Sequence, residues 1–300
     1  MSLKLYLEPT QGASSWTDAI TQHIPHIPCN SMEEADFIVS TRIPYGSTDA
    51  LLIQQTLHSY RDIKKRVLVF LLSDYNEPFD IPPNVLLFRA GMYRSKKKSN
   101  EYLIPYVWVK EELKGEEDSP PLPRQTHRPI VGFCGSIASH PCRLSHINQV
   151  KRAPDLKSNV IIRTDHWAGK PHDAQVVREF VKNIRDSHFT LCSRGAGNWS
   201  ARFYQVLSLG RIPVVVDTDM VFPWEEHIPW QHIIVRCPQG QDQEIAPRIR
   251  QVWNAGNIVD VQRQCRRIYE EYLSPEAWGH RIATEILEPL LVSQSSGSPS

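Results

Sequence analysis

The sequence predicts an α/β fold made of two doubly wound, Rossmann-like domains with a cleft between them. Short apolar segments of strand length alternate with segments of helix length along most of the 300 residues. A proline-rich segment, residues 119–128, separates two such series. The second series also contains a glycine-rich turn between a strand and a helix. We therefore expect ligands at the carboxyl ends of the strands, where such sheets bind them.

The first series defines an N-terminal domain over residues 1–118, which we expect to face the acceptor. Its strands are predicted at Leu3–Leu7, Phe37–Ser40, Val67–Leu72 and Val85–Phe88, and its helices at Ser15–Gln22 and Thr48–Leu57. An acidic stretch at Glu111–Glu117 leads into the proline-rich linker.

The second series defines a C-terminal domain over residues 129–292, followed by a Ser/Gly/Pro-rich tail, 293–300, that we expect to be disordered. Strands are predicted at Pro129–Cys134, Asn159–Arg163, His188–Cys192, Ile212–Val216 and His232–Arg236. Helices are predicted near Ala174–Asp186, from Ser200 to Leu209, and near Glu244–Asn254, Asp260–Leu273 and Pro275–Leu291. The last helix could cross back to the first domain.

The most informative segment runs from His188 to Val235, a strand, a glycine-rich loop, a helix and a second strand. A glycine loop that leads into a helix presents backbone N–H groups and a positive dipole end to an anion. Arg202 falls in the first turn of this helix, where the dipole disfavours a cation unless an anion lies in front of it. The residues predicted to hold a diphosphate are Arg194, Gly195, Gly197, Asn198, Ser200 and Arg202. For the two arginines, a structural ion pair is the alternative.

Further positions could join this site. Gly135 and Ser136 follow the first strand of the second domain and would let the backbone approach the phosphates, with Arg143 and His140 on the next loop, although an ordinary turn fits equally well. Arg163 ends the next strand and could face the same cleft, or simply lie on the surface.

The same segment resembles the C-terminal half of exostosin-like glycosyltransferases. The matching residues are Leu191, Cys192, Arg194, Gly195, Gly197, Ser200, Arg202, Phe203, Gly210, Ile212, Pro213, Val214, Pro223 and Trp230. Weaker similarity covers Val131–Ser136 and Phe88–Tyr106. The family has a Glu where this chain has Gln205.

The resemblance implies the two-domain GT-B class of glycosyltransferase and a role in polysaccharide biosynthesis. It implies transfer of a sugar from a nucleotide-diphosphate donor, such as a UDP-sugar, to a glycan or other hydroxyl acceptor. Inversion at the anomeric carbon and independence of metal ions follow from the same resemblance. Gln205 stands where the donor ribose is held, and we group Arg163 and Asp217 with it as donor ribose or base contacts. The base that deprotonates the acceptor is expected in the N-terminal domain, with Asp74 and Glu101 as candidates.

Two other functions remain open. The loop from Gly195 to Ser200 matches GxGxxG except that Ser200 replaces the third glycine, and Asp217 and Asp219 lie about 20 residues on, as in dinucleotide-binding oxidoreductases. An inactive, donor-binding partner is the second alternative, suggested by Gln205. The Asp217-Thr218-Asp219 triplet could hold Mn²⁺ or Mg²⁺, but the preceding Gly-x-Ile-Pro-Val strand resembles the metal-independent class, so we expect no metal and no cofactor.

Composition limits the partners and the compartment. The formal net charge of +1 argues against broad binding to nucleic acid. The six cysteines lie far apart and are predicted to be reduced core residues. The sequence contains no apolar stretch of about 18 residues and no signal-peptide pattern, from which we expect no transmembrane segment and a cytoplasmic location.

Overall fold

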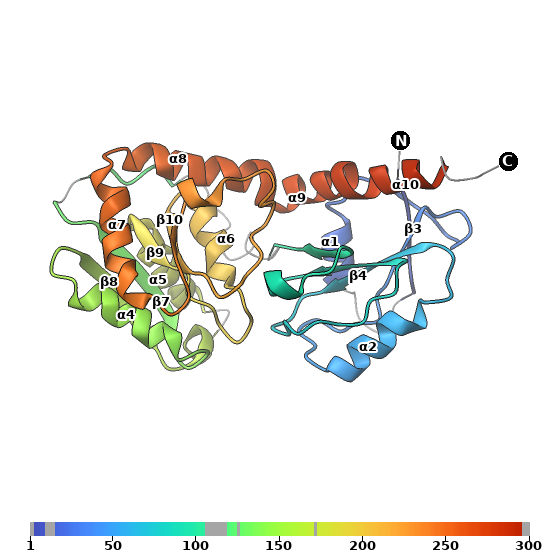
Figure 1. The fold of residues 1–300 in the computed structure, drawn as a ribbon, viewed down its shortest axis with the longest axis horizontal. Helices are drawn as coiled ribbons and strands as arrows, with labels where there is room; N and C mark the ends of the chain where they lie inside the picture. The colour runs from blue at the N-terminus through green and yellow to red at the C-terminus, as the bar shows by residue number, and fades with distance from the viewer. Residues whose placement is uncertain (1–2, 10–15, 106–118, 125–126, 171–172, 296–300) are drawn as a thin grey trace. The chain divides into compact units, whose positions relative to one another are not determined.

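A computed structural model describes residues 3–9, 16–105, 119–124, 127–170 and 173–295. The chain divides into two compact units (Figure 1). Unit 1 comprises Met1–Val107 and Glu271–Ser300, and unit 2 comprises Trp108–Glu270. Each unit contains a parallel sheet with flanking helices, which confirms the predicted α/β fold of two doubly wound domains.

The sheet of unit 1 has six parallel strands in the order β2-β1-β3-β4-β5-β6. The strands are β1 (Lys4–Leu7), β2 (Ile27–Pro28), β3 (Phe37–Val39), β4 (Arg66–Leu71), β5 (Val85–Arg89) and β6 (Glu101–Leu103). The helical segments are α1 (Trp16–Thr21), α2 (Ala50–Ser59), the 3₁₀ turn η1 (Arg94–Lys96), α9 (Pro275–Arg281), the π-helix η6 (Ile282–Leu287) and α10 (Glu288–Ser295). Every residue of β3 and β5 is buried, as expected for central strands covered on both faces.

The sheet of unit 2 has five parallel strands in the order β11-β10-β9-β7-β8. The strands are β7 (Ile130–Ser136), β8 (Lys157–Arg163), β9 (Phe189–Leu191), β10 (Ile212–Val216) and β11 (Val235–Cys237). The α-helices are α4 (Cys142–Arg152), α5 (Ala174–Arg185), α6 (Ala201–Ser208), α7 (Ile245–Asn254) and α8 (Ile258–Ile268). Shorter helical segments are η2 (His166–Gly169), η3 (Trp230–His232) and η4 (Asp242–Glu244), and the π-helix η5 (Tyr269–Leu273) continues α8 beyond the boundary between the units.

Right-handed crossovers place α4 and α5 on opposite faces of this sheet, because the chain steps in opposite directions from β7 to β8 and from β8 to β9. α4 packs against α7, and α6 packs against α8 (Figure 1). Both ends of α6 match the sequence prediction, since Ser200 is its N-cap residue and Gly210 follows it with φ +61°.

The C-terminal helix predicted at Pro275–Leu291 belongs to unit 1 rather than to the C-terminal domain. Trp278 on α9 is 1% exposed and donates from its indole N–H to the carbonyl of Leu103, at the end of β6. Gly279 is so close to the first part of the chain that a Cβ there would lie 1.9 Å from the carbonyl oxygen of His23. The crossing back that the sequence left open is therefore present.

The described part of the predicted linker packs on unit 2. Leu122 exchanges two backbone hydrogen bonds with the side-chain amide of Gln262, which is fully buried. His188 donates from Nε2 to the carbonyl of Pro123 and accepts the N–H of Ile130 at Nδ1, an assignment of the ring proton that satisfies both bonds. Prolines leave carbonyls free to accept such bonds, so a proline-rich stretch can lie along a folded surface. The acidic stretch 111–117 lies outside the described residues. The tail predicted to be disordered at 293–300 begins within α10, which runs to Ser295, and its residues 296–300 lie outside the described ranges.

The six cysteines are unpaired, and Cys134, Cys192, Cys237 and Cys265 are buried. Over the described ranges, no helix is both long and apolar enough to cross a membrane. The cytoplasmic location stays a prediction.

Candidate functional site

The carboxyl ends of β7 and β9 form the switch point of the sheet in unit 2. β7 comes first along the chain, β8 is then added on one side of it and β9 on the other. Ligands of doubly wound sheets bind at such a point, because the connections leave the two strands toward opposite faces. β7 ends at Gly135 and Ser136, and the glycine-rich loop 192–200 follows β9. The sequence-predicted phosphate residues therefore lie at this switch point.

Arg143, in the first turn of α4, ties the two loops together. Its Nη1 donates to the carbonyl of Ser136 over 2.8 Å, and its Nε donates to the carbonyl of Arg194 over 2.9 Å. Its Nη2 reaches the carbonyl of Ser193 at 3.5 Å. A Cβ on Gly195 would lie 3.2 Å from the same Nη2, so the glycine permits this close approach. From the sequence Arg143 was expected on the loop after Gly135 and Ser136, whereas the structure places it in α4, which was not predicted.

Arg202 supports the same strand ends from within the unit. It was predicted to face a diphosphate, but the residue is 7% exposed and its guanidinium donates to the carbonyls of Cys134 and Leu191 over 2.8 and 3.3 Å. It lies 4.5 Å from the centre of the Phe133 ring. Burial lowers the pKa of Arg202. These contacts make Arg202 a clamp between β7 and β9.

Gly135 is required by this clamp. Its φ is +155°, and a Cβ at this position would lie 2.5 Å from Nη2 of Arg202. The glycine thus allows a buried guanidinium to lie directly against the backbone at the end of β7. The positive charge of Arg202 remains close to any ligand that approaches this turn.

Two titratable side chains of these loops, Arg194 and His140, are partly exposed to solvent. Arg194 is half-buried and donates from Nη2 to the carbonyl of Ala196 over 3.3 Å. Its Nε is buried and has no hydrogen-bond partner among the described residues. Burial lowers the pKa of His140, and the positive charges of Arg194 and Arg143 lower it further. The arrangement concentrates positive charge at the switch point.

The remainder of the glycine-rich loop is packed inward. Asn198 is fully buried and accepts the hydroxyl of Thr218 over 2.5 Å. Trp199 packs edge-on against Phe203 and Phe222. Ser200 occupies the N-cap position of α6, yet its side chain makes no capping hydrogen bond. Gly195 and Ala196, with Arg194, form the solvent-facing part of the loop.

A buried histidine fixes the start of the loop. His146 on α4 is hydrogen bonded through Nδ1 to the hydroxyl of Ser193 over 2.7 Å, and its Nε2 lies 3.5 Å from a carboxylate oxygen of Asp242. Burial lowers the pKa of His146, against the opposing effect of Asp242. Ser193 is 2% exposed, so this trio holds the loop and does not present a nucleophile.

Other predicted site residues have partners within the unit. The Ser136 hydroxyl donates to the carbonyl of Thr164, and Arg163 pairs with Glu179 at 3.1 Å. Asp217 is paired with Arg236. Gln205, one turn after Arg202, is 4% exposed.

The two candidate bases occupy different environments in unit 1. Asp74 is exposed in the turn that follows β4, at the carboxyl edge of its sheet. Glu101 is 1% exposed, accepts from Arg89 over 2.9 Å and also accepts the N–H of Lys98 over 2.8 Å. The carboxylate of Glu101 is committed to a buried ion pair, which argues against a role as the base.

Unit 1 also carries a polar network at its own switch point, between β1 and β3, which the sequence analysis missed. Glu8 directly follows β1, is 8% exposed and accepts from Tyr60 over 2.5 Å and from Arg42 over 2.6 Å. The Tyr60 oxygen also accepts the hydroxyl of Ser40. Burial and the bond to Glu8 raise the pKa of Tyr60. A charged residue immediately after a predicted strand was the available signal.

The fold and the site define a protein of two doubly wound α/β units, with a cationic pair of turns at the switch point of the second. Residues 88–252 match the model of the Exostosin GT47 domain. This match covers more than half of the chain, and the chain belongs to the exostosin family.

Individual relatives are more distant. The chain is 32% identical over 87 residues to a probable glucuronosyltransferase of Oryza sativa subsp. japonica, Os02g0520750, covering 29% of this chain and 19% of that protein. It is 24% identical over 209 residues to Exostosin-2 of Homo sapiens, covering 66% of this chain and 28% of the relative. The chain thus spans less than a third of the length of either relative. A solved glycosyltransferase from Rickettsia africae ESF-5 aligns with a TM-score of 0.47 and 11% identity over 97% of this chain and 99% of that one.

Proposed function

We propose that this chain is a glycosyltransferase that takes a sugar from a nucleotide-diphosphate donor and transfers it to a glycan or another hydroxyl acceptor. The observation that carries the proposal is the concentration of positive charge at the switch point of unit 2, where Arg143 and Arg194 join the two turns. Membership of the exostosin family supports the same activity. Several relatives are named probable glucuronosyltransferases, so a nucleotide-activated glucuronic acid is the first donor to test.

The donor diphosphate would bind against Gly135 and the exposed arc from Arg194 to Ala196. Arg194 is half-buried, and the exposed part of its side chain would bind the diphosphate directly. Arg143 would set the spacing between the two turns, and the buried charge of Arg202 would add electrostatic attraction from behind Gly135. A pre-positioned set of cations stabilises the leaving diphosphate as negative charge develops on it.

In this scheme transfer inverts the anomeric carbon and needs no metal ion. Asp74 is the proposed base, because its carboxylate is exposed at the carboxyl edge of the unit 1 sheet. Asp217 is neutralised by Arg236, which makes the Asp217-Thr218-Asp219 triplet a poor cation ligand. Gln205 remains the proposed ribose contact.

A thermal-shift screen of UDP, GDP, UDP-glucuronic acid, NAD⁺ and NADPH tests the proposal. A ligand present at about 100 times its dissociation constant stabilises by about 2.7 kcal/mol, which is a shift of several degrees. We expect stabilisation by a nucleoside diphosphate that survives excess EDTA. Stabilisation by NAD⁺ or NADPH alone would favour the oxidoreductase instead.

Arg194→Ala provides the test of the site, with Arg178→Ala on the exposed face of α5 as the matched control. Charge-assisted hydrogen bonds contribute about 1.5–3 kcal/mol, so Arg194→Ala should weaken binding by roughly tenfold to a hundredfold. Equal affinities of the two variants would remove Arg194 from the site. Tight nucleotide binding without turnover across a broad panel of donors and acceptors would identify an inactive partner.

A further inference from the structure

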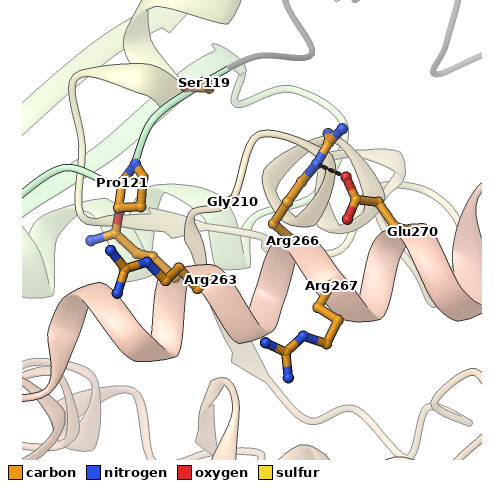
Figure 2. Close-up of a pocket in the computed structure, with 8 residues that line it drawn as sticks. Ser119, Pro121, Gly210, Arg263, Arg266, Arg267 and Glu270 are labelled. Atoms are coloured by element: carbon orange, nitrogen blue, oxygen red, sulfur yellow. Dashed lines mark hydrogen bonds and ion pairs between the residues drawn. The ribbon is translucent and has the colours of Figure 1, made fainter.

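A second candidate binding site lies in unit 2, at the opposite edge of its sheet. A half-open cavity of about 290 Å³ lies between α8, the start of η5, the extended segment 119–122 and the turn before β10 (Figure 2). Its lining residues are Ser119, Pro121, Gly210, Gln262, Arg263, Arg266, Arg267 and Glu270. Gly210 precedes β10, whereas the turns of the proposed donor site follow the carboxyl ends of β7 and β9. The cavity is therefore separate from that site.

The wall opposite α8 is fixed by buried side chains. Gln262 is fully buried and holds Leu122 through two hydrogen bonds of 2.7 and 2.9 Å. Arg211 is 3% exposed and donates to the Ser119 hydroxyl and to the carbonyl of Gly210. Because this wall is already ordered before a ligand binds, part of the entropic cost of binding is removed.

The lining is strongly cationic. It holds three guanidinium groups and one carboxylate, a formal excess of two positive charges. Arg263 is paired with Asp260 on the exposed face of α8, where such a pair contributes little. Arg266 is partly buried, pairs with Glu270 of η5 and also donates to the carbonyl of Ser208. Arg267 is exposed and has no ion-pair partner within the described ranges. Figure 2 shows Arg263 reaching toward Pro121 and Arg266 toward Glu270.

The buried Arg211 adds to the positive electrostatic potential of the cavity. Its guanidinium donates only to carbonyls and to the Ser119 hydroxyl among the described residues, and burial lowers its pKa to about 10. A cation that is desolvated without a carboxylate partner gains from a nearby anion.

The size and the polar groups of the cavity select the kind of anion. At about 290 Å³ it lies at the lower end of small-molecule sites, so it suits one sugar ring better than a nucleotide. Guanidinium groups bind carboxylates through paired hydrogen bonds. The Glu270 carboxylate would repel a bare anion but can accept hydrogen bonds from sugar hydroxyls, and the Ser119 hydroxyl can do the same.

We propose that this cavity binds one acidic sugar residue, with its carboxylate held by Arg263 and Arg267 and its hydroxyls by Glu270 and Ser119. The site is independent of the proposed transferase activity. It would give the chain a second point of attachment to a uronic-acid-containing glycan.

The test is titration of the protein with glucuronate, glucose and inorganic phosphate, followed by NMR or calorimetry. We expect glucuronate to bind with a dissociation constant in the millimolar range, and glucose and phosphate to bind at least tenfold more weakly. If phosphate binds as tightly as glucuronate, the cavity is a general anion site. If glucose binds as tightly as glucuronate, the carboxylate of the ligand is not recognised. Either result overturns the proposal, as does the absence of glucuronate binding.

Two variants locate the site. Arg267→Glu changes an exposed side chain, so it should leave the fold intact and weaken glucuronate binding at least tenfold. Arg178→Ala is the matched control and should bind as the natural protein does. Arg194→Ala should also retain glucuronate binding, which separates a failure of this proposal from a failure of the donor site. Unchanged affinity of Arg267→Glu would refute the assignment.

Discussion

Replacement of Arg202 tests whether this side chain supports the site or forms its surface. Arg202→Ala leaves the carbonyls of Cys134 and Leu191 without their donors, and each buried, unsatisfied group costs about 1–3 kcal/mol. The contact with Phe133 adds about 1 kcal/mol. Relief of the buried charge offsets part of this loss. We therefore expect unit 2 to lose about 3–5 kcal/mol of stability in Arg202→Ala.

Arg202→Met separates the contribution of packing to stability from that of hydrogen bonding, because methionine fills the space of the aliphatic part of the side chain but donates no hydrogen bond. It should cost about 1–2 kcal/mol less than the alanine variant. Urea denaturation followed by tryptophan fluorescence measures both, with Arg178→Ala as a control expected within about 0.5 kcal/mol of the natural protein. An Arg202→Ala variant that is as stable as this control but binds a nucleoside diphosphate tenfold more weakly would refute the clamp and place the guanidinium on the ligand.

Three further outcomes are expected. Glu101→Gln should lower the free energy of unfolding by about 3–5 kcal/mol, because it leaves Arg89 buried without its counter-charge; a stable variant that loses only transfer would instead make Glu101 catalytic. His188 accepts the N–H of Ile130, and burial lowers its folded pKa below the unfolded value, so its contribution to stability is complete above about pH 6.5 and lost as pH falls through the folded pKa. A urea midpoint that does not change between pH 7.5 and 5 would contradict this. Gln205→Glu should tighten binding of a nucleoside diphosphate by about 1 kcal/mol if it meets the ribose; lower stability with unchanged affinity would assign it to the core.

The parts of the fold that could be predicted are those in which apolar pattern and turn chemistry agree. The strand at Ile212–Val216 matches β10 residue for residue, because a buried apolar run is bounded by Gly210 and Asp217. The helix α4 was missed for the opposite reason. Its buried face carries Arg143 and His146 with Ile147 and Val150, at helical spacing, so half of the pattern is polar. Arg143 and His146, which hold the site together, are also the residues that interrupt the apolar pattern by which a helix is predicted.

The roles of the arginines could not be predicted from sequence for a related reason. A cation in the first turn of α6 requires nearby negative charge, and from the sequence we expected a bound diphosphate to provide it. In the fold, the partial charges come from the carbonyls of Cys134 and Leu191 at two strand ends, one of which is 68 residues away from Arg202. Such partners depend on the order of strands in the sheet, which one sequence does not fix. Both turns were predicted at the carboxyl ends of strands, whereas the switch point depends on the strand order, which was not predicted.

Hydrogen–deuterium exchange with and without saturating UDP tests the central claim most directly. The claim is that a nucleoside diphosphate binds where β7 and β9 end. We expect the amides of residues 135–143 and 193–200 to exchange more slowly in the presence of UDP, and those of α8 to exchange at an unchanged rate. Protection confined to α8 or to unit 1, with no change at residues 135–143 and 193–200, would contradict the account.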